Sequence, residues 1–322
     1  MKHILMMRGA RTLVDMCTKI KAGENVLVVT DFEKFEIAEV VAAAANERGG
    51  EVTIAIMTPR KADSAEPPPS VAEAMKKSDV IFTPVLKSIT HTQAVKNAAA
   101  AGARILVMTH FTPEIMISGG IEADFEAQKL VCQNVARTLE QGKHLHLTTQ
   151  KGTNLTANIE GRRGNALYCI VEPGEFSTVP TIEANVSPVE GSAEGVIVAD
   201  ASIPYLGIGV LREPVTLTVK KGMITSIDGG DQARVLAENL KSLGDPNVYN
   251  IAEVGIGLNP KSRMTGIMLD DEGVFGSVHI GIGTNITLGG TLKTACHYDA
   301  LQWRGTIEVD GRLILENGQL KI

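Results

Sequence analysis

The chain has 322 residues, of which 44% are hydrophobic and 21% charged, and its formal net charge is -6. This composition is that of an ordinary globular protein, long enough for one large domain or two smaller ones. The mildly acidic balance contains no basic run, so neither nucleic acid nor an anionic membrane surface is expected as a partner.

The first residues, MKHILMMRGARTLVDM, lack a secretory pattern because Arg8 and Arg11 interrupt a short apolar run. Apolar stretches elsewhere are shorter than the roughly 18–20 residues that span a bilayer. The cysteines are widely spaced and form no CxxC pair, which is typical of reduced thiols; they are Cys17, Cys132, Cys169 and Cys296. We therefore expect a cytoplasmic protein.

Residues 1–142 alternate between strand and helix patterns. Helical stretches are expected at Phe35–Arg48 and from about Thr92 to Ala101. The strand-like runs between and around them are Val26–Asp31, Glu51–Met57, Asp79–Val85 and Ala103–Thr109. Apolar strands separated by amphipathic helices predict a parallel sheet covered on both faces. The first domain is therefore predicted to be a Rossmann-like, open α/β domain.

This first domain lacks the glycine pattern of a dinucleotide site. After Asp31 the chain reads FEKFEIAEVV, without the G-x-G-x-x-G that lets a backbone approach a pyrophosphate. We expect it to bind neither nicotinamide nor flavin.

Residues 143–322 have a different character. Asp124–Gln141 is an amphipathic helix that joins the two halves, and alternating, hairpin-like segments begin at His144. Further strands are expected at Gly195–Ala201, Val215–Lys220 and Met223–Asp228, followed by a helix at Asp231–Leu243. The sequence predicts a β-rich α+β domain, which we expect to carry the functional site.

The densest group of polar residues lies between Glu253 and Asp299. In an extended segment, His297 and Asp299 face the same side, so an imidazole and a carboxylate converge on one point. This arrangement suits Zn²⁺, Mn²⁺ or Fe²⁺, although a plain hydrogen-bonded pair gives the same pattern. The pair is a candidate half of a metal site.

Three more residues are candidate ligands. Glu253 and His279 stand among apolar and glycine residues, where a buried carboxylate needs a cation or strong hydrogen bonds. Glu175 follows a Pro-Gly turn. Taken singly, His279 could be a core residue and Glu175 a solvated one. Weaker candidates are the alternating His144 and His146, and the charged turn 270–272, which we expect to be solvated although Glu272 could contact the ligands.

Several segments resemble those of the thermophilic metallo-aminopeptidases of the aminopeptidase T and S type. They are PGEFSTVP, SAEGVIV, AEVGIGLNP, SVHIGIG and TACHYD, in the order seen in that family. The resemblance implies that the metal ligands are Glu175, Glu253, His279, His297 and Asp299. The family also has a tyrosine ligand, and Ile286 stands at its position here.

The segments GDPNVYNIAEVGIGLNP and GTNITLGGTLKTACHYD also resemble the related 2,5-dihydroxypyridine 5,6-dioxygenases, iron enzymes of nicotinate breakdown. In that family two histidines and one aspartate hold the iron. His297 and Asp299 match two of them, whereas Glu253 takes the place of the other histidine.

The leading hypothesis is an aminopeptidase-like, metal-dependent hydrolase that cleaves a small amide or short peptide. A water activated by Zn²⁺, Mn²⁺ or Co²⁺ would attack the carbonyl, with Glu253 and Glu175 as catalytic residues and Glu175 as a ligand or general base. One alternative is an Fe(II)-dependent ring-cleaving dioxygenase of a hydroxylated pyridine or related aromatic. A second is a non-catalytic binding protein with a structural metal. The family resemblance also implies a homo-oligomer.

Overall fold

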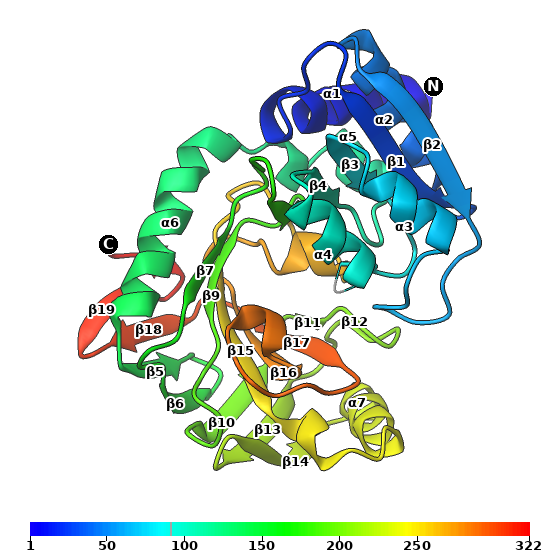
Figure 1. Ribbon diagram of the computed structural model, residues 1–322. Helices are drawn as coiled ribbons and strands as arrows, with labels where there is room; N and C mark the ends of the chain where they lie inside the picture. Colours follow the sequence, from blue (N-terminus) through cyan, green and yellow to red (C-terminus); the bar gives the residue numbers. More distant parts are fainter. Residues whose placement is uncertain (91) are drawn as a thin grey trace. The chain divides into compact units, whose positions relative to one another are not determined.

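The computed structural model describes residues 1–90 and 92–322, which form two compact units. The first unit comprises residues 1–129 and 168–180, and the second comprises residues 130–167 and 181–322. This division differs from the expected domains 1–142 and 143–322 in two places. Helix α6, Phe125–Gln141, continues into the second unit, and residues 168–180 return to the first because they supply a strand to its sheet (Figure 1).

The first unit is built on a five-stranded sheet in the order β2-β1-β3-β4-β8, and every neighbouring pair is parallel. The strands are β1 Asn25–Asp31, β2 Glu51–Met57, β3 Val80–Thr83, β4 Arg104–Val107 and β8 Phe176–Thr178. The predicted Rossmann-like parallel sheet is confirmed, and four of its strands lie where the apolar runs placed them.

Helices complete the first unit. They are α1 Lys2–Arg11, α2 Phe35–Glu47, α3 Pro69–Met75, α4 Gln93–Ala100 and α5 Pro113–Ile117, with the π-helical turn η1 Thr12–Cys17 and the 3₁₀ turn η2 Gly120–Glu122. Leu27, Ile81 and Ile105 of the sheet share a buried cluster with Met75 of α3 and Val95 of α4. Apolar residues at every second strand position thus line one face of the sheet, and these helices cover that face.

The second unit contains an eight-stranded antiparallel sheet, ordered β14-β13-β10-β6-β5-β18-β19-β20. Its strands are β5 His144–Thr148, β6 Asn154–Asn158, β10 Glu194–Ala199, β13 Val215–Lys220, β14 Met223–Asp228, β18 Thr306–Val309, β19 Arg312–Glu316 and β20 Gln319–Leu320. The hairpins expected from the alternating segments are present. Helix α7, Asp231–Ser242, follows β14 as predicted, and η3, Pro246–Tyr249, follows α7.

A second antiparallel sheet of this unit has the order β17-β16-β15-β9-β7. Its strands are β7 Gly164–Leu167, β9 Glu183–Val186, β15 Ile251–Gly257, β16 Val278–Gly283 and β17 His297–Gln302. Short elements between strands are the pair β11 Ser202–Ile203 and β12 Gly209–Val210, α8 Met268–Asp271 and η4 Ile286–Leu288. Every residue of β15 and β16 is buried, so polar side chains on them require partners.

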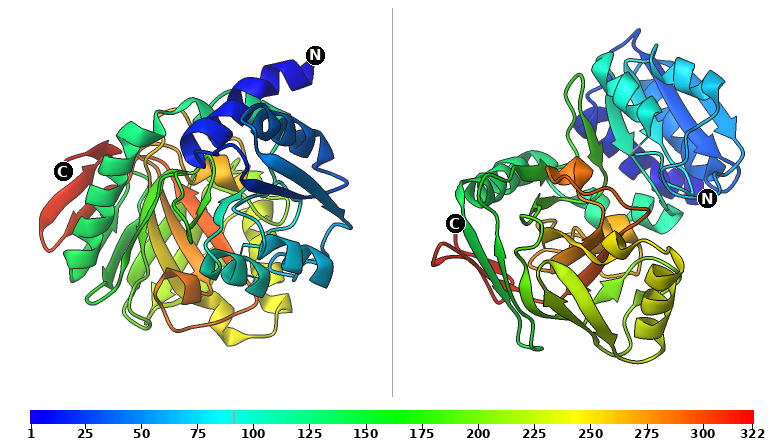
Figure 2. Two further views of the ribbon diagram at one scale, coloured as in Figure 1. Left: turned by 45° about the horizontal axis from the view of Figure 1, so that its top comes forward. Right: turned by 60° about the horizontal axis from the view of Figure 1, so that its bottom comes forward.

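Helix α6 packs against β7, and its C-terminal end lies near the β18–β19 hairpin (Figure 2). A side chain at Gly164 would lie 1.9 Å from the carbonyl oxygen of Ala136, and one at Gly142 would lie 2.2 Å from Val309. Close packing against the Ala136 backbone and the Val309 side chain therefore favours glycine at both positions. In the described parts of the chain, no helix is both long and apolar enough to cross a membrane.

Candidate metal centre

Five potential metal ligands lie on one face of the five-stranded antiparallel sheet β17-β16-β15-β9-β7. Antiparallel pairing sets Glu253 of β15 opposite Gly281 of β16, and Gly281 opposite Asp299 of β17. Directly opposed residues share a face, as do residues two apart along a strand. The same register brings Glu183 from β9, His279 from β16 and His297 from β17 to this face.

Each of the five ligands has a glycine as its direct cross-strand neighbour. The glycines are Gly255 and Gly257 of β15, and Gly281 and Gly283 of β16. A Cβ at Gly255 would lie 1.9 Å from His279 Nε2, and a Cβ at Gly281 would lie 2.6 Å from the Cβ of Glu253. Because these glycines have no side chain, the ligand side chains can lie across them on the face of the sheet.

The ligand atoms form two groups that share Glu253. Glu183, Glu253 and His279 make one group, and Glu253, His297 and Asp299 make the other. His279 Nε2 lies 3.5 Å from Glu253 Oε1 and 3.4 Å from Glu183 Oε2. His297 Nε2 lies 3.0 Å from Glu253 Oε2 and 3.4 Å from Asp299 Oδ1.

These residues fit a divalent metal ion. Glu183 Oε2 and Asp299 Oδ1 are buried and make no hydrogen bond among the described residues, although an imidazole nitrogen lies 3.4 Å from each. Burying a charged oxygen without a hydrogen bond costs several kcal/mol, which a cation would offset. Two ligands about 2.1 Å from one ion, at an angle near 100°, are ~3.2 Å apart. The observed spacings are close to this value.

Hydrogen bonds orient two of the ligands. His297 Nδ1 lies 2.7 Å from the carbonyl oxygen of Thr284, which can only accept, so Nδ1 carries a proton and Nε2 is the nitrogen that faces Glu253 and Asp299. Tyr205 donates its hydroxyl proton to Asp299 Oδ2 at 2.7 Å, which leaves Oδ1 for an ion. The Tyr205 oxygen also lies 3.2 Å from Glu272 Oε1.

The charges of the cluster shift every pKa within it. Burial disfavours the charged imidazoles, but the neighbouring carboxylates outweigh burial, raising the pKa of His279 to about 9 and that of His297 well above its usual value. Burial raises the pKa of Glu183 to about 7 and that of Glu272 well above its usual value. For Asp299 the imidazoles and the Tyr205 hydroxyl outweigh burial and lower the pKa.

The structure brings together Glu253, His279, His297 and Asp299, four of the five ligands expected from the sequence. Glu175 belongs to the first unit, where its exposed carboxylate accepts a hydrogen bond from the Glu172 backbone at 3.0 Å, and it is in neither ligand group.

Sequence reasoning missed Glu183, which is buried. The available signal was a carboxylate between the apolar residues Ile182 and Ala184 in TIEANV. Sequence reasoning also missed Tyr205. The prediction of a solvated turn at 270–272 is wrong, because all three carboxylates are buried. Ser202 and the backbone at Thr265 and Gly266 donate to Asp271, while Glu272 contacts Tyr205. His144 and His146 lie on β5, outside both ligand groups.

Residues 6–322 match the family model of 2,5-dihydroxypyridine 5,6-dioxygenase (NicX). A curated protein of that name from Pseudomonas putida KT2440 is 27% identical over 260 residues, which cover 77% of this chain and 72% of the relative.

Solved structures share the fold. The structure of 2,5-dihydroxypyridine dioxygenase from Pseudomonas putida KT2440 aligns with a TM-score of 0.84 at 21% identity, covering 99% of this chain and 97% of that one. Wild-type AmpT from Thermus thermophilus aligns with a TM-score of 0.72 at 15% identity, covering 99% of both chains. The predicted resemblance to the dioxygenase is confirmed, and the resemblance to aminopeptidase T is confirmed at the level of the fold.

The leading expectation of an aminopeptidase-like metallo-hydrolase is wrong. It gave weight to Glu253 and His279, but carboxylate and imidazole ligands suit hydrolytic and oxidative metals alike and do not specify the reaction. The family model and the curated relative instead favour the dioxygenase alternative. The match extends from residue 6 to the last residue of the chain and includes the whole ligand cluster. The chain belongs to the 2,5-dihydroxypyridine 5,6-dioxygenase family.

Proposed function

We propose that this protein is an Fe(II)-dependent dioxygenase that cleaves the ring of a hydroxylated pyridine or a related aromatic compound. The observation that carries the proposal is the family match over residues 6–322, which contain a buried cluster of metal ligands. A cytoplasmic location and a homo-oligomeric state stay predictions from the sequence and the family resemblance.

Glu253, His297 and Asp299 are the residues that would hold the iron. One imidazole and two carboxylates are nitrogen and oxygen donors that Fe(II) accepts, and three protein ligands leave positions free for other molecules. When bound, the iron supplies a redox-active site at which dioxygen and a ring hydroxyl group can meet. In a ring-cleaving dioxygenase both atoms of O₂ enter the product as one ring bond breaks, so no external reductant is consumed.

The surrounding residues would orient the ligands and hold protons. The Thr284 carbonyl fixes the tautomer of His297, and the Tyr205 hydroxyl aims one oxygen of Asp299 at the ion. Burial raises the pKa of Glu272 well above its usual value. The Tyr205 hydroxyl lies 3.2 Å from Glu272 Oε1 and 2.7 Å from Asp299 Oδ2, so it links the two carboxyl groups.

This ligand set is more negative than the two-histidine, one-aspartate set that the dioxygenase resemblance implies. Glu253 stands in place of the second histidine, and two carboxylates balance the charge of one Fe(II). An anionic ring oxygen would therefore meet less positive charge at the ion. His279, 3.5 Å from Glu253, offsets part of this difference when it is protonated.

The test is oxygen consumption by protein purified without air and reloaded with Fe²⁺ or Zn²⁺ in parallel. We expect O₂ uptake with 2,5-dihydroxypyridine or another dihydroxylated ring from the Fe²⁺ sample and none from the Zn²⁺ sample. Absence of uptake with Fe²⁺ across dihydroxylated pyridines and benzenes would refute the proposal.

A further inference from the structure

The segment between β16 and β17, residues 284–296, leads directly into His297 and also supports its imidazole. The Thr284 carbonyl is the acceptor for His297 Nδ1 at 2.7 Å. Whatever fixes Thr284 therefore fixes the angle of the ring and the position of Nε2. Both chain neighbours of Thr284, Gly283 and Asn285, form hydrogen bonds with side chains from other segments.

On one side, Asn250 holds Gly283. The Asn250 side-chain amide donates to the Gly283 carbonyl at 3.0 Å, and the Gly283 backbone donates to the Asn250 carbonyl at 2.8 Å. This side belongs to the sheet, because residue 250 immediately precedes β15.

On the other side, Asn285 is fully buried and surrounded by polar groups. Its amide nitrogen donates to Ser187 Oγ at 3.1 Å and to Glu190 Oε1 at 2.9 Å, and its Oδ1 accepts from the Leu292 backbone at 2.8 Å. A Cβ at Gly290 would lie 2.0 Å from Asn285 Cγ, so the loop closes tightly around this amide.

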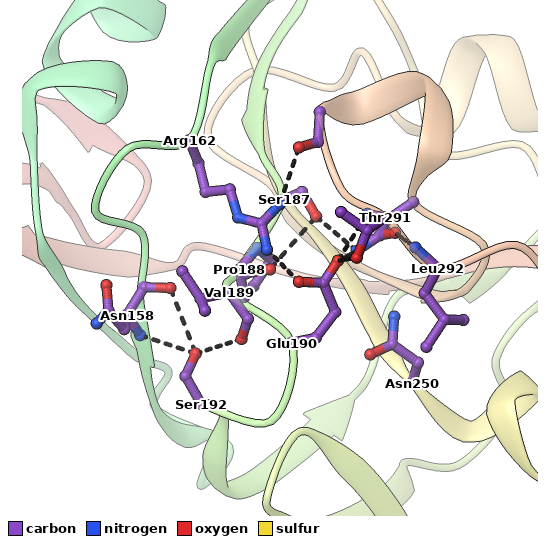
Figure 3. Close-up of polar contacts among 12 residues, drawn as sticks. Asn158, Arg162, Ser187, Pro188, Val189, Glu190, Ser192, Asn250, Thr291 and Leu292 are labelled. Carbon is purple, nitrogen blue, oxygen red and sulfur yellow. Dashed lines mark hydrogen bonds and ion pairs between the residues drawn. The ribbon is translucent and has the colours of Figure 1, made fainter.

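Glu190 is the charged anchor of the loop (Figure 3). Its Oε1 also accepts from the Thr291 backbone at 2.8 Å and from Thr291 Oγ1 at 3.1 Å. Its Oε2 pairs with Arg162, which donates in turn to the Gly289 carbonyl at 2.8 Å. The Arg162 side chain is only 10% exposed, so solvent screens this ion pair weakly.

The charge of Glu190 is maintained across the ordinary pH range. Burial alone would raise its pKa, but hydrogen bonds from Thr291 and Asn285, together with Arg162, outweigh burial and lower the pKa to about 2. Charged acceptors make stronger hydrogen bonds than neutral ones. Removing this carboxylate would leave the Asn285 amide and Arg162 without their shared partner.

We propose that Glu190 is a positioning residue for the metal centre, acting through Asn285 and the Thr284 carbonyl on His297. This assignment rests on the proposed function to the extent that His297 must be a metal ligand. Groups that bond directly to a metal-binding imidazole typically contribute about 10–100-fold to metal affinity. Glu190 acts one step further out, so an effect near the lower end, roughly tenfold, is expected.

The test is the affinity of the whole protein for Co²⁺ alone, measured by chelator competition in wild type, Glu190→Ala and Glu190→Gln. We expect Glu190→Ala to bind Co²⁺ about tenfold more weakly, with a changed visible Co²⁺ spectrum and faster hydrogen exchange over residues 284–296. Glu190→Gln keeps an acceptor oxygen for Asn285 and Thr291 and should recover part of the affinity.

Glu160→Ala is the matched control. Glu160 pairs with Lys143 in the same unit at 2.7 Å, but both side chains are more than half exposed, so its removal should leave Co²⁺ affinity unchanged. Should Glu190→Ala fail to fold, Glu190→Gln carries the comparison.

Wild-type Co²⁺ affinity in the folded Glu190 variants would overturn the inference, whether or not loop exchange accelerates. A wild-type protein that binds no Co²⁺ would overturn the metal centre as well, so the two failures are distinguishable.

Discussion

Each imidazole of the cluster lies next to two carboxylates, so the metal-free cluster balances its charge with protons. His279 lies beside Glu183 and Glu253, and His297 lies beside Glu253 and Asp299. These carboxylates raise the pKa of His279 to about 9 and that of His297 well above its usual value. A divalent ion would take the place of protons that the imidazoles hold near neutral pH.

Metal binding should therefore release protons. Since His297 is protonated near pH 7 in the metal-free protein and would become a ligand, Co²⁺ affinity should rise as pH increases from about 6, with about one proton released per ion. Titration calorimetry in buffers of different ionisation enthalpy measures this number. Affinity that is constant between about pH 6 and pH 8 would contradict the assignment of His297 as a ligand.

Tyr205 and Tyr298 provide a matched pair for testing how Asp299 is oriented. Their rings are 5.2 Å apart, but the Tyr205 hydroxyl donates to Asp299 whereas the Tyr298 hydroxyl donates to Asn239. Tyr205→Phe should weaken Co²⁺ binding by roughly 10–100-fold, and Tyr298→Phe should leave it near wild type. Chelator competition checks both, and equal affinities in the two variants would exclude a specific role for the Tyr205 hydroxyl.

The residues of the site differ in how far the sequence could predict them. His297 and Asp299 are two apart on one strand, so their convergence follows from local geometry. Glu183 reaches the cluster only because β9 pairs with β15, and no local pattern encodes that pairing. Glu175 carries the motif of the resemblance, but its segment belongs to the sheet of the first unit.

At the scale of elements, strands β15 and β16 share a sequence pattern of a ligand followed by alternating glycines. In AEVGIG and VHIGIG, glycines follow the ligand at alternate positions, and apolar residues fill the other face. The glycine face gives the ligands room, while the apolar face is buried. Alternating glycines beside a buried Glu or His are therefore a usable signal for a site on a sheet.

Gly255→Ala should weaken metal binding while leaving the protein folded. The new Cβ would lie 1.9 Å from His279 Nε2, so the ring must move and disturb the proposed ligand Glu253, whose Oε1 lies 3.5 Å from it. Ile256→Val is the control on the opposite face of β15, where it should cost about 0.5–1.5 kcal/mol of stability and no metal affinity. Metal analysis with thermal unfolding separates these effects; full occupancy in Gly255→Ala would show that the ring tolerates the methyl group.

Most strands and helices could be predicted because their periodicity is local. Strand β8 could not, because it has three residues and its partner β4 lies about 70 positions earlier in the chain. For the same reason the sequence placed a single boundary at 142/143, whereas the chain leaves the first unit and returns to it. Pairing between distant segments depends on the whole fold rather than on the pattern of either segment.

At the scale of the whole molecule, the candidate ligands come from four strands that lie between residues 183 and 302 of the chain, β9, β15, β16 and β17. An ion bound by them stabilises the folded protein and not the unfolded chain. Metal-free protein should lose stability as pH rises, because the folded-state pKa of His279, about 9, exceeds its unfolded value of about 6.5. That contribution is fully present below about pH 6.5 and is lost as pH passes through about 9.

Thermal unfolding of metal-free and Co²⁺-loaded protein from about pH 6.5 to pH 9 tests this linkage. The metal-free Tm should fall over this range, and the difference between loaded and metal-free protein should widen. A metal-free Tm that rises toward pH 9 would mean that the histidines do not hold the extra protons.

The reaction itself is a property of the whole chain that the ligand set alone does not determine. The solved structures of 2,5-dihydroxypyridine dioxygenase and AmpT share this fold, and a shared fold does not specify a reaction. The family match along residues 6–322 is what favours the dioxygenase, because it covers almost the whole chain rather than a single motif.

Isotope incorporation is therefore the most direct test of the central claim. Fe²⁺-loaded protein is mixed with 2,5-dihydroxypyridine under ¹⁸O₂, and the ring-opened product is analysed by mass spectrometry, with His297→Ala as the inactive control. The proposed dioxygenase predicts a product carrying both ¹⁸O atoms from one O₂, formed by wild type only. A product whose new oxygen comes solely from water, or equal turnover by His297→Ala, would contradict the proposed function.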